Sequence, residues 1–139
     1  MINKMSKKIE LHQTGHDWVQ QYKYSAAAVV GDLVFVSGQV GVDDHGKIVD
    51  EGNFLAQAHQ AFRNIEQVLS VAGSTMAHVA KATIYLVNAD DFEHVPGLRS
   101  QYFSDPYPAD TTVIVSSLAR PGLLIEIEVV AVRRGSIQS

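Results

Sequence analysis

The first half of the chain alternates between short apolar runs and polar turns. Residues 26–30 and 33–37 are two β-prone runs, and the Gly31-Asp32 pair between them is typical of a β-hairpin. A polar stretch at 43–47 follows and predicts a turn. The pattern therefore predicts that the domain begins with paired strands.

Helical periodicity replaces this alternation in the middle of the chain. From 53 to 72 the apolar residues fall on one helical face, and Gly73 offers the left-handed position that ends a helix. Residues 79–87 predict a buried strand. A second helix is predicted over 91–103, and Pro96 inside it should kink the helix or mark its true start.

The last third of the chain predicts two closing strands, 111–117 and 123–133. The second carries Glu126 and Glu128 within an otherwise apolar run. Side chains in a strand repeat every second residue, so both glutamates share one face. Buried carboxylates need partners or shifted pKa values. The pair marks either a site of chemistry or the solvent side of a half-exposed strand.

The predicted order ββαβαββ describes one α+β domain over 1–139, a mixed β-sheet with two helices packed on one face. Residues 1–20 are polar, and they predict an irregular N-terminal arm or a short leading strand. The apolar strand residues exceed what two helices can cover. This excess hints that another subunit buries some of them.

Composition limits the function classes. The formal net charge is -4, which offers no electrostatic support for nucleic-acid binding. There is no cysteine, which excludes thiolate chemistry and fits a reducing compartment. We expect a cytoplasmic protein that does not enter membranes, because no apolar run approaches a bilayer span and the N-terminus lacks the apolar core of a signal peptide.

The histidines and serines show no familiar catalytic pattern. None of the six histidines forms an HxH or HExxH motif, so a metal site has little support. Ser37 has no histidine or aspartate at the spacing of a hydrolase triad, and we expect it to donate a hydrogen bond to a ligand instead. Tyr24 is expected either to do the same or to pack at the start of the hairpin.

Three segments carry a family resemblance: YSAAAVVGDLVFVSGQVG at 24–41, AFRNIEQVLSVAGSTMAHVAKATIYLVNADDF at 61–92, and YPADTTVIVSSLARPGLLIEIEVVAVRR at 107–134. In this order they resemble the Rid/YjgF family, whose members are called reactive intermediate deaminases or, in older usage, endoribonuclease L-PSP. Ser-Gly-Gln and Glu-Ile-Glu are weak motifs singly. In this order, and separated by a helix of the length predicted over 53–72, the two motifs together are specific for the family.

The resemblance implies a chorismate-mutase-like fold and a homotrimer with a ligand cleft at each subunit interface. In the family the cleft is lined by a tyrosine, the serine of Ser-Gly-Gln, an arginine in Pro-Ala-Arg and the first glutamate of Glu-Ile-Glu. Tyr24, Ser37 and Glu126 match three of these positions. The fourth departs from the pattern, because Asp110 stands where the arginine is expected.

This departure changes the expected ligand. A guanidinium would hold a substrate carboxylate by paired hydrogen bonds, whereas Asp110 would repel it. Asp110 near Glu126 would raise the pKa of one of the two carboxyl groups, and such a pair would work as acid and base or hold a cationic ligand. Alternatively, Asp110 turns into solvent. Arg120, in the turn before the last strand, is a candidate substitute for the arginine, whereas Arg99 on the second helix is expected to be exposed.

The first hypothesis is a hydrolytic deaminase of small imine or enamine metabolites that needs no cofactor. Glu126 would orient or activate water, helped by Tyr24 and Ser37, and backbone groups after Asp110, at Thr111, would bind the substrate oxygen. Without the arginine, little activity is expected on substrates of the 2-aminoacrylate type. The alternative is a non-catalytic trimer that binds a small ligand. A ribonuclease is disfavoured by the acidic chain and the lack of a histidine pair.

Overall fold

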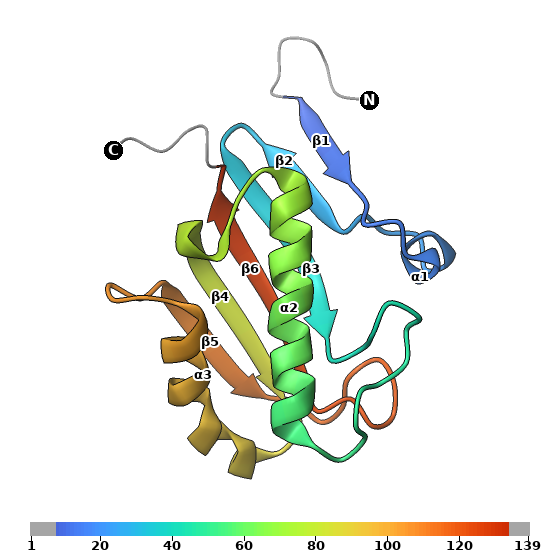
Figure 1. Ribbon diagram of the computed structural model, residues 1–139, viewed down its shortest axis with the longest axis vertical. Helices are drawn as coiled ribbons and strands as arrows, with labels where there is room; N and C mark the ends of the chain where they lie inside the picture. The colour runs from blue at the N-terminus through green and yellow to red at the C-terminus, as the bar shows by residue number, and fades with distance from the viewer. Residues whose placement is uncertain (1–7, 134–139) are drawn as a thin grey trace.

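The computed structural model describes residues 8–133, which form one six-stranded sheet with helices (Figure 1). The strands lie in the order β1-β2-β3-β6-β4-β5. Only β4 and β5 pair in parallel, so the sheet is mixed, as predicted. The elements along the chain are β1 (Ile9–His12), α1 (Asp17–Gln21), β2 (Ala27–Val30), β3 (Leu33–Val40), α2 (Phe54–Ala72), η1 (Met76–His78), β4 (Val79–Leu86), η2 (Ala89–His94), α3 (Val95–Tyr102), β5 (Ala109–Ile114) and β6 (Ile125–Val132).

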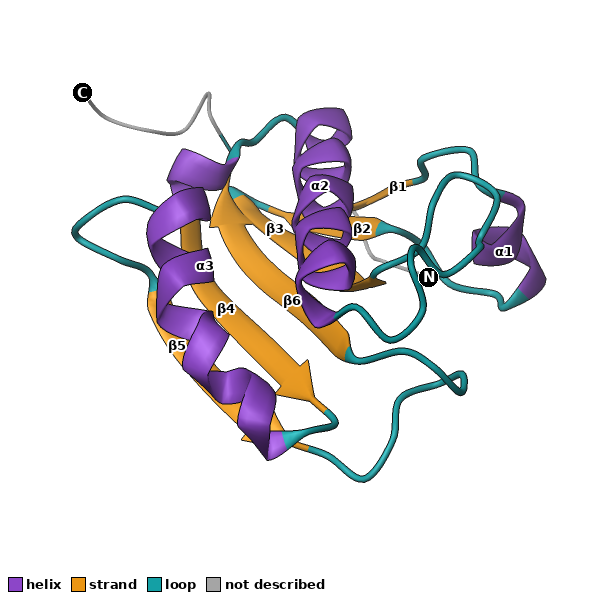
Figure 2. Ribbon diagram, turned by 60° about the horizontal axis from the view of Figure 1, so that its bottom comes forward, coloured by secondary structure: helices purple, strands orange, loops and turns teal. Residues whose placement is uncertain are grey.

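Both long helices cover the same face of the sheet (Figure 2). The Asn53 side chain caps α2 by accepting a hydrogen bond from the backbone of Ala56 at 3.0 Å, and Gly73 ends the helix at φ 87°. The apolar face of α2 packs on β3 and β6. The core between these layers includes Phe62 and Ile127, which have no exposed surface. The α+β class with two helices on one face is thereby confirmed.

Several predicted boundaries need correction. The second helix does not begin at 91, because residues 89–94 form a 3-10 turn and α3 begins at Val95, immediately before Pro96. The strand predicted over 111–117 runs instead over Ala109–Ile114. The leading strand exists as β1, which pairs with β2, whereas residues 1–7 and Arg134 lie outside the described part of the chain.

The short helix α1 was not predicted at all, and it places residues 17–21 beyond β1 at one side of the sheet (Figure 1). Its five residues are too few to show a helical period. Within residues 8–133, none of the helices has the length and apolar character needed to cross a bilayer.

Strand β6 lies inside the sheet between β3 and β4, and its residues alternate in burial. Ile125, Ile127 and Val129 are buried under the helices, whereas Glu126 and Glu128 point to the face that no helix covers. The shared face predicted for the two glutamates is therefore confirmed. Because β6 is an inner strand, its backbone holds both carboxylates in a defined register.

Candidate functional site

Glu126 lies beside an irregularity in the neighbouring strand. The pairing of β3 with β6 shifts by one residue at Ser37 and Gly38, which together stand opposite the single residue Glu128. Such a β-bulge bends its strand and re-aims the side chains on it. Ser37 and Gly38 are thereby placed next to the Glu126 carboxylate.

Gly38 leaves the space that the Glu126 side chain occupies. A Cβ atom at position 38 would lie 2.0 Å from Oε2 of Glu126 and 2.8 Å from its Cδ. Real Cβ atoms do not approach other atoms this closely, so any residue with a side chain at 38 would displace the carboxyl group. The glycine of Ser37-Gly38-Gln39 therefore serves to admit Glu126.

The pKa of Glu126 is raised above its ordinary value of 4.5, first by burial and second by the negative charge of Glu128. Glu128 itself accepts a hydrogen bond from the hydroxyl of Tyr85, a residue of β4 that stands opposite Glu126 in register and shares the uncovered face. This bond raises the pKa of the Tyr85 phenol. Glu126 is thus a half-buried carboxyl group poised to exchange protons closer to neutral pH.

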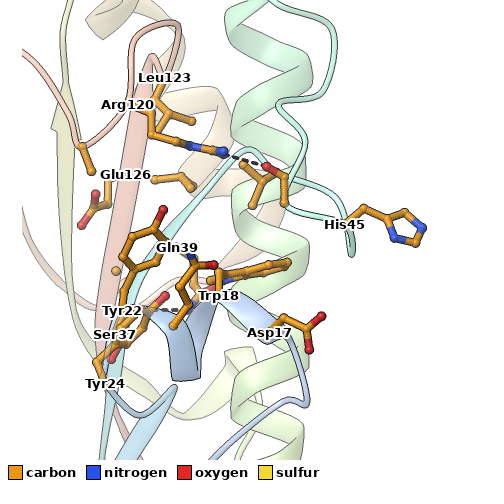
Figure 3. Close-up of a pocket in the computed structure, with 16 residues that line it drawn as sticks. Asp17, Trp18, Tyr22, Tyr24, Ser37, Gln39, His45, Arg120, Leu123 and Glu126 are labelled. Atoms are coloured by element: carbon orange, nitrogen blue, oxygen red, sulfur yellow. Dashed lines mark hydrogen bonds between the residues drawn. The ribbon is translucent and has the colours of Figure 1, made fainter.

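The Glu126 side chain lines a pocket with a volume of about 700 Å³ (Figure 3). A pocket of this size is in the range that holds small organic ligands. It is lined by residues of α1, β3, β6 and the loops between them: Asp17, Trp18, Gln21, Tyr22, Tyr24, Ser37, Gly38, Gln39, Val40, Val42, His45, Gly46, Ala119, Arg120, Leu123 and Glu126. Four of the predicted site residues therefore meet in one place, although they are more than a hundred positions apart in the sequence.

Tyr24 lines the pocket, and its side chain is 39% exposed. Burial raises the pKa of its phenol, a hydrogen bond from Trp18 lowers it, and the charge of Glu126 raises it further. Tyr24 is accordingly a neutral hydroxyl within electrostatic reach of Glu126.

Ser37 lines the pocket, and its hydroxyl is engaged within the chain. It donates a hydrogen bond of 2.6 Å to the carbonyl oxygen of Ser25. The lone pairs of Oγ remain available to accept a hydrogen bond from an N–H or from water. Donation from Ser37 to a ligand stays a prediction, and it would require this bond to Ser25 to be exchanged.

Arg120 lies across the mouth of the pocket, where its Nη2 donates to the carbonyl oxygen of Gly46 at 2.8 Å (Figure 3). The loop that carries it is anchored by Gln57, whose side chain is fully buried. Gln57 donates to the carbonyl of Gly122 at 3.0 Å and accepts from the backbone N–H of Leu124 at 2.9 Å. These bonds fix the entry of the chain into β6, two residues before Glu126.

Asp110 and Thr111 do not line this pocket. Asp110 pairs with Ala82 in register, which places its side chain on the helix-covered face, opposite to that of Glu126. There Asp110 Oδ1 accepts from Arg99 Nη2 at 2.5 Å. The idea of an Asp110–Glu126 pair is therefore wrong within one subunit, and so is the idea that Asp110 turns into solvent.

Arg99 was expected to be exposed, but only 26% of its side chain is. Its Nη2 also donates to Oγ1 of Thr112 at 2.8 Å, and this hydroxyl donates to Asp110 at 2.7 Å. Thr111 projects to the other face, where Lys81 donates to its hydroxyl at 2.6 Å. Asp110 thus forms a local ion pair on the edge strand β5, and its charge is balanced there.

Trp18 and Tyr22 are pocket residues that the sequence patterns did not single out. Trp18 is the only tryptophan of the chain, and it lies in a polar segment with no strand or helix period. An isolated large aromatic residue in such a segment was the available signal, since it needs an apolar partner to be buried. Among residues 8–133, no three His, Cys, Asp or Glu side chains converge as metal ligands would.

A mixed sheet with two helices on one face, and a half-buried glutamate that lines a pocket on the other, defines a protein of the YjgF-like fold. The family model described as Endoribonuclease L-PSP matches residues 16–133, nearly the whole chain. The chain therefore belongs to this family, which is the Rid/YjgF family. The membership and the chorismate-mutase-like fold expected from the sequence are both confirmed.

The relatives agree in fold and differ in what they are called. A goat (Capra hircus) protein named 2-iminobutanoate/2-iminopropanoate deaminase is 36% identical over 79% of this chain and 80% of its own. The solved structure of RidA from an Antarctic Psychrobacter bacterium has a TM-score of 0.74 and 34% identity, covering 79% of this chain and 88% of that one. YyfA from Yersinia pestis, titled a Rid-family protein of unknown function, has a TM-score of 0.82 and 31% identity, with coverage of 90% and 99%.

Proposed function

We propose that this protein is a hydrolytic deaminase of small imines or enamines. The observation that carries the proposal is Glu126, a carboxyl group with a raised pKa inside a pocket shared with Tyr24 and Ser37. Relatives named 2-iminobutanoate/2-iminopropanoate deaminase support the reaction class. The acceptor oxygen of Ser37 suits an iminium N–H, and the carboxylate of Glu126 suits a water molecule.

In the proposed reaction, the oxygen of water forms a bond to the iminium carbon while one of its protons passes to the Glu126 carboxylate. Glu126 then returns this proton to the nitrogen of the carbinolamine. The C–N bond breaks with its electron pair going to nitrogen, and the remaining hydroxyl proton passes to Glu126 as the carbonyl forms. Glu126 then gives this proton to the departing ammonia, which leaves as ammonium, and Glu126 is again a carboxylate. The net change is iminium plus water to carbonyl compound plus ammonium, and general acid–base catalysis of this kind contributes about 10²–10⁴-fold.

The substrate we propose is not of the 2-aminoacrylate type. A substrate carboxylate is best held by an arginine that is free to form two parallel hydrogen bonds. Asp110 occupies the position that the sequence comparison assigned to such an arginine, and it binds Arg99 instead. Arg120 lines the pocket but is exposed and bonded to Gly46. Carboxylate binding therefore has weak support on this scaffold.

We further propose that three chains assemble with a ligand cleft at each interface. Leu33 and Phe35, both 43% exposed, and Val113, 38% exposed, lie on the sheet face that the helices leave uncovered. Apolar side chains gathered on one open face favour burial by another subunit.

The test is imine hydrolysis measured by competition. Imines are generated in situ by an amine or amino-acid oxidase, and semicarbazide traps whatever the protein does not hydrolyse. Wild type should lower the rate of semicarbazone formation, and Glu126→Gln should abolish at least nine-tenths of that effect. Full activity of Glu126→Gln, with the fold intact by circular dichroism, would refute the role of the carboxylate.

A non-catalytic trimer that binds a small ligand is the second candidate, and the Arg99–Asp110 ion pair favours it. Asp110 stands where the family pattern has its substrate-binding arginine, and Arg99 holds it in an ion pair. Asp110→Arg alone would set two guanidinium groups together, so the informative variant is the exchange Arg99→Asp with Asp110→Arg. If wild type is silent and the exchange hydrolyses imino acids, the site is a redirected enzyme. If both are silent on every imine, the binding protein is the better description.

A further inference from the structure

Residues 17–24 form one wall of the pocket, and three of them are aromatic. We call Trp18, Tyr22 and Tyr24 the aromatic wall. Tyr22 is 66% exposed and Tyr24 39%, which is unusual for two large rings beside the same cavity. Exposed aromatic rings around a concave site supply a large contact area to a flat or apolar ligand at little cost in conformational entropy.

The wall is rigid because Trp18 is held from several directions. The ring of His16 stacks on the indole at a centroid distance of 4.3 Å and an interplanar angle of 7°. Hydrogen bonds join Nδ1 of His16 to Oγ1 of Thr14 at 2.8 Å and Nε2 to Asp44 at 3.3 Å. The backbone at Gly46 passes close enough that a Cβ there would lie 3.2 Å from the indole.

The charges around the pocket favour a cation. Glu126 lies inside it and Asp17 lies exposed at its rim, whereas Arg120 is the only lysine or arginine among the lining residues and is tied to Gly46. Figure 3 shows His45 turned away from the other labelled side chains. Aromatic faces attract cations, and carboxylates do so more strongly. An iminium or ammonium group therefore suits this site better than a carboxylate.

We propose that Trp18 is a specificity-determining residue and that the pocket takes iminium ions that carry an aromatic or similarly flat apolar group and no carboxylate. The claim that these ions are hydrolysed rests on the proposed deaminase function, whereas the claim that the pocket binds them does not. The volume of about 700 Å³ supports it, because a propanoate or butanoate imine would leave most of that space to water.

Binding is tested first, with stable amines in place of the reactive imines. Calorimetry compares 2-phenylethylammonium with ethylammonium on wild type, Trp18→Ala, Trp18→Phe and Phe92→Ala. Wild type should bind the phenyl compound about tenfold more tightly, as expected for one aromatic contact. Trp18→Ala should bring the two affinities within about threefold, whereas Trp18→Phe, which keeps a flat ring, should preserve most of the preference.

Phe92→Ala is the matched control, since Phe92 is 46% exposed and lies on η2, outside the pocket. Equal affinities of wild type for the two amines, or no binding of either at millimolar concentration, would overturn the inference. An equal loss of affinity for both amines in Trp18→Ala would also overturn the inference, because it would show that Trp18 acts on the structure of the pocket and not on the choice of ligand. Tighter binding of phenylalanine than of 2-phenylethylammonium would overturn the exclusion of carboxylates.

Two further measurements keep the outcomes separate. Because Trp18 is the only tryptophan, its fluorescence in wild type reports occupancy of the pocket even if Trp18→Ala fails to fold. The imines of the same two amines are then generated by an amine oxidase and followed by semicarbazide competition. Selective binding with no hydrolysis of either imine would leave the ligand class standing and refute the deaminase. Hydrolysis of both imines at equal rates, unchanged in Trp18→Ala, would support the deaminase and refute the specificity assigned to Trp18.

Discussion

Replacing Gly38 by alanine should separate the activity of this protein from its stability. The new Cβ would lie 2.0 Å from Oε2 of Glu126, and an ordinary contact is about 3.5 Å, so the carboxylate must retreat by about 1.5 Å. Misplacement of a reacting group by about 1 Å costs roughly 10²-fold in rate. The same displacement is cheap for the fold, because a flexible side chain absorbs it for about 0.5–1.5 kcal/mol.

Two other glycines provide matched comparisons. A Cβ at Gly41 would meet the backbone of Gln57 at 2.7 Å, which cannot rotate away, so Gly41→Ala should destabilise the fold by about 1–3 kcal/mol. A Cβ at Gly97 would meet nothing within 4 Å, and alanine is the better helix former, so Gly97→Ala should stabilise by up to about 1 kcal/mol. The three variants make the same chemical change in three environments.

The assay pairs semicarbazide competition with thermal unfolding followed by circular dichroism. Gly38→Ala should retain a melting temperature within a few degrees of wild type and lose most of its activity. Gly97→Ala should keep its activity. Full activity of Gly38→Ala at an unchanged melting temperature would refute the claim that the position of the Glu126 carboxylate matters, and unfolding of Gly38→Ala would show that the close approach is structural.

Two further predictions concern charge. Because burial raises the pKa of Glu126 in the folded state, its stabilising contribution is complete below its ordinary value of 4.5 and is lost as the pH rises through the raised value. The stability of wild type relative to Glu126→Gln, measured by urea unfolding, should therefore fall across that window, and a difference that is flat with pH would contradict the raised pKa. Asp110→Ala should destabilise by about 1–3 kcal/mol, because it leaves the half-buried Arg99 without its partner. The exchange Arg99→Asp with Asp110→Arg should recover at least half of that loss, and no recovery would show that the ion pair is not what stabilises β5.

Local patterns predicted most of the elements. The helix over 53–72 is confirmed almost to the residue, because the apolar period and the residues at its two ends, Asn53 and Gly73, each act through neighbours one helical turn away. The boundaries of the second helix were wrong because the Ala89–His94 segment forms a 3-10 turn, for which the sequence has no separate period. The helix α1 was missed because five residues carry no usable periodicity.

Site residues were predictable from the sequence only where they belong to a family motif or to a strand with alternating burial. Alternation in β6 placed Glu126 and Glu128 on one face, and the family resemblance added Tyr24 and Ser37. Arg120 was a candidate because it lies in the turn before the last strand. All of these residues except Glu128 line the pocket. The strand register places the side chains of Asp110 and Glu126 on opposite faces of the sheet, so the two do not meet within one subunit. A shift of parity by one residue moves a side chain to the opposite face of a sheet, and sequence alone does not report which strands pair.

By itself, the sequence determined the family, the α+β class and the alternation that turns Glu126 toward the uncovered face, because these depend on short-range periods and on motifs in order. The tertiary structure alone decided three things: that Gly38 leaves room for the Glu126 carboxyl, that Asp110 binds Arg99, and that Trp18 lines the same pocket as Glu126. Each is a contact between segments far apart in the chain. Such contacts depend on strand register and side-chain packing, which no local pattern encodes.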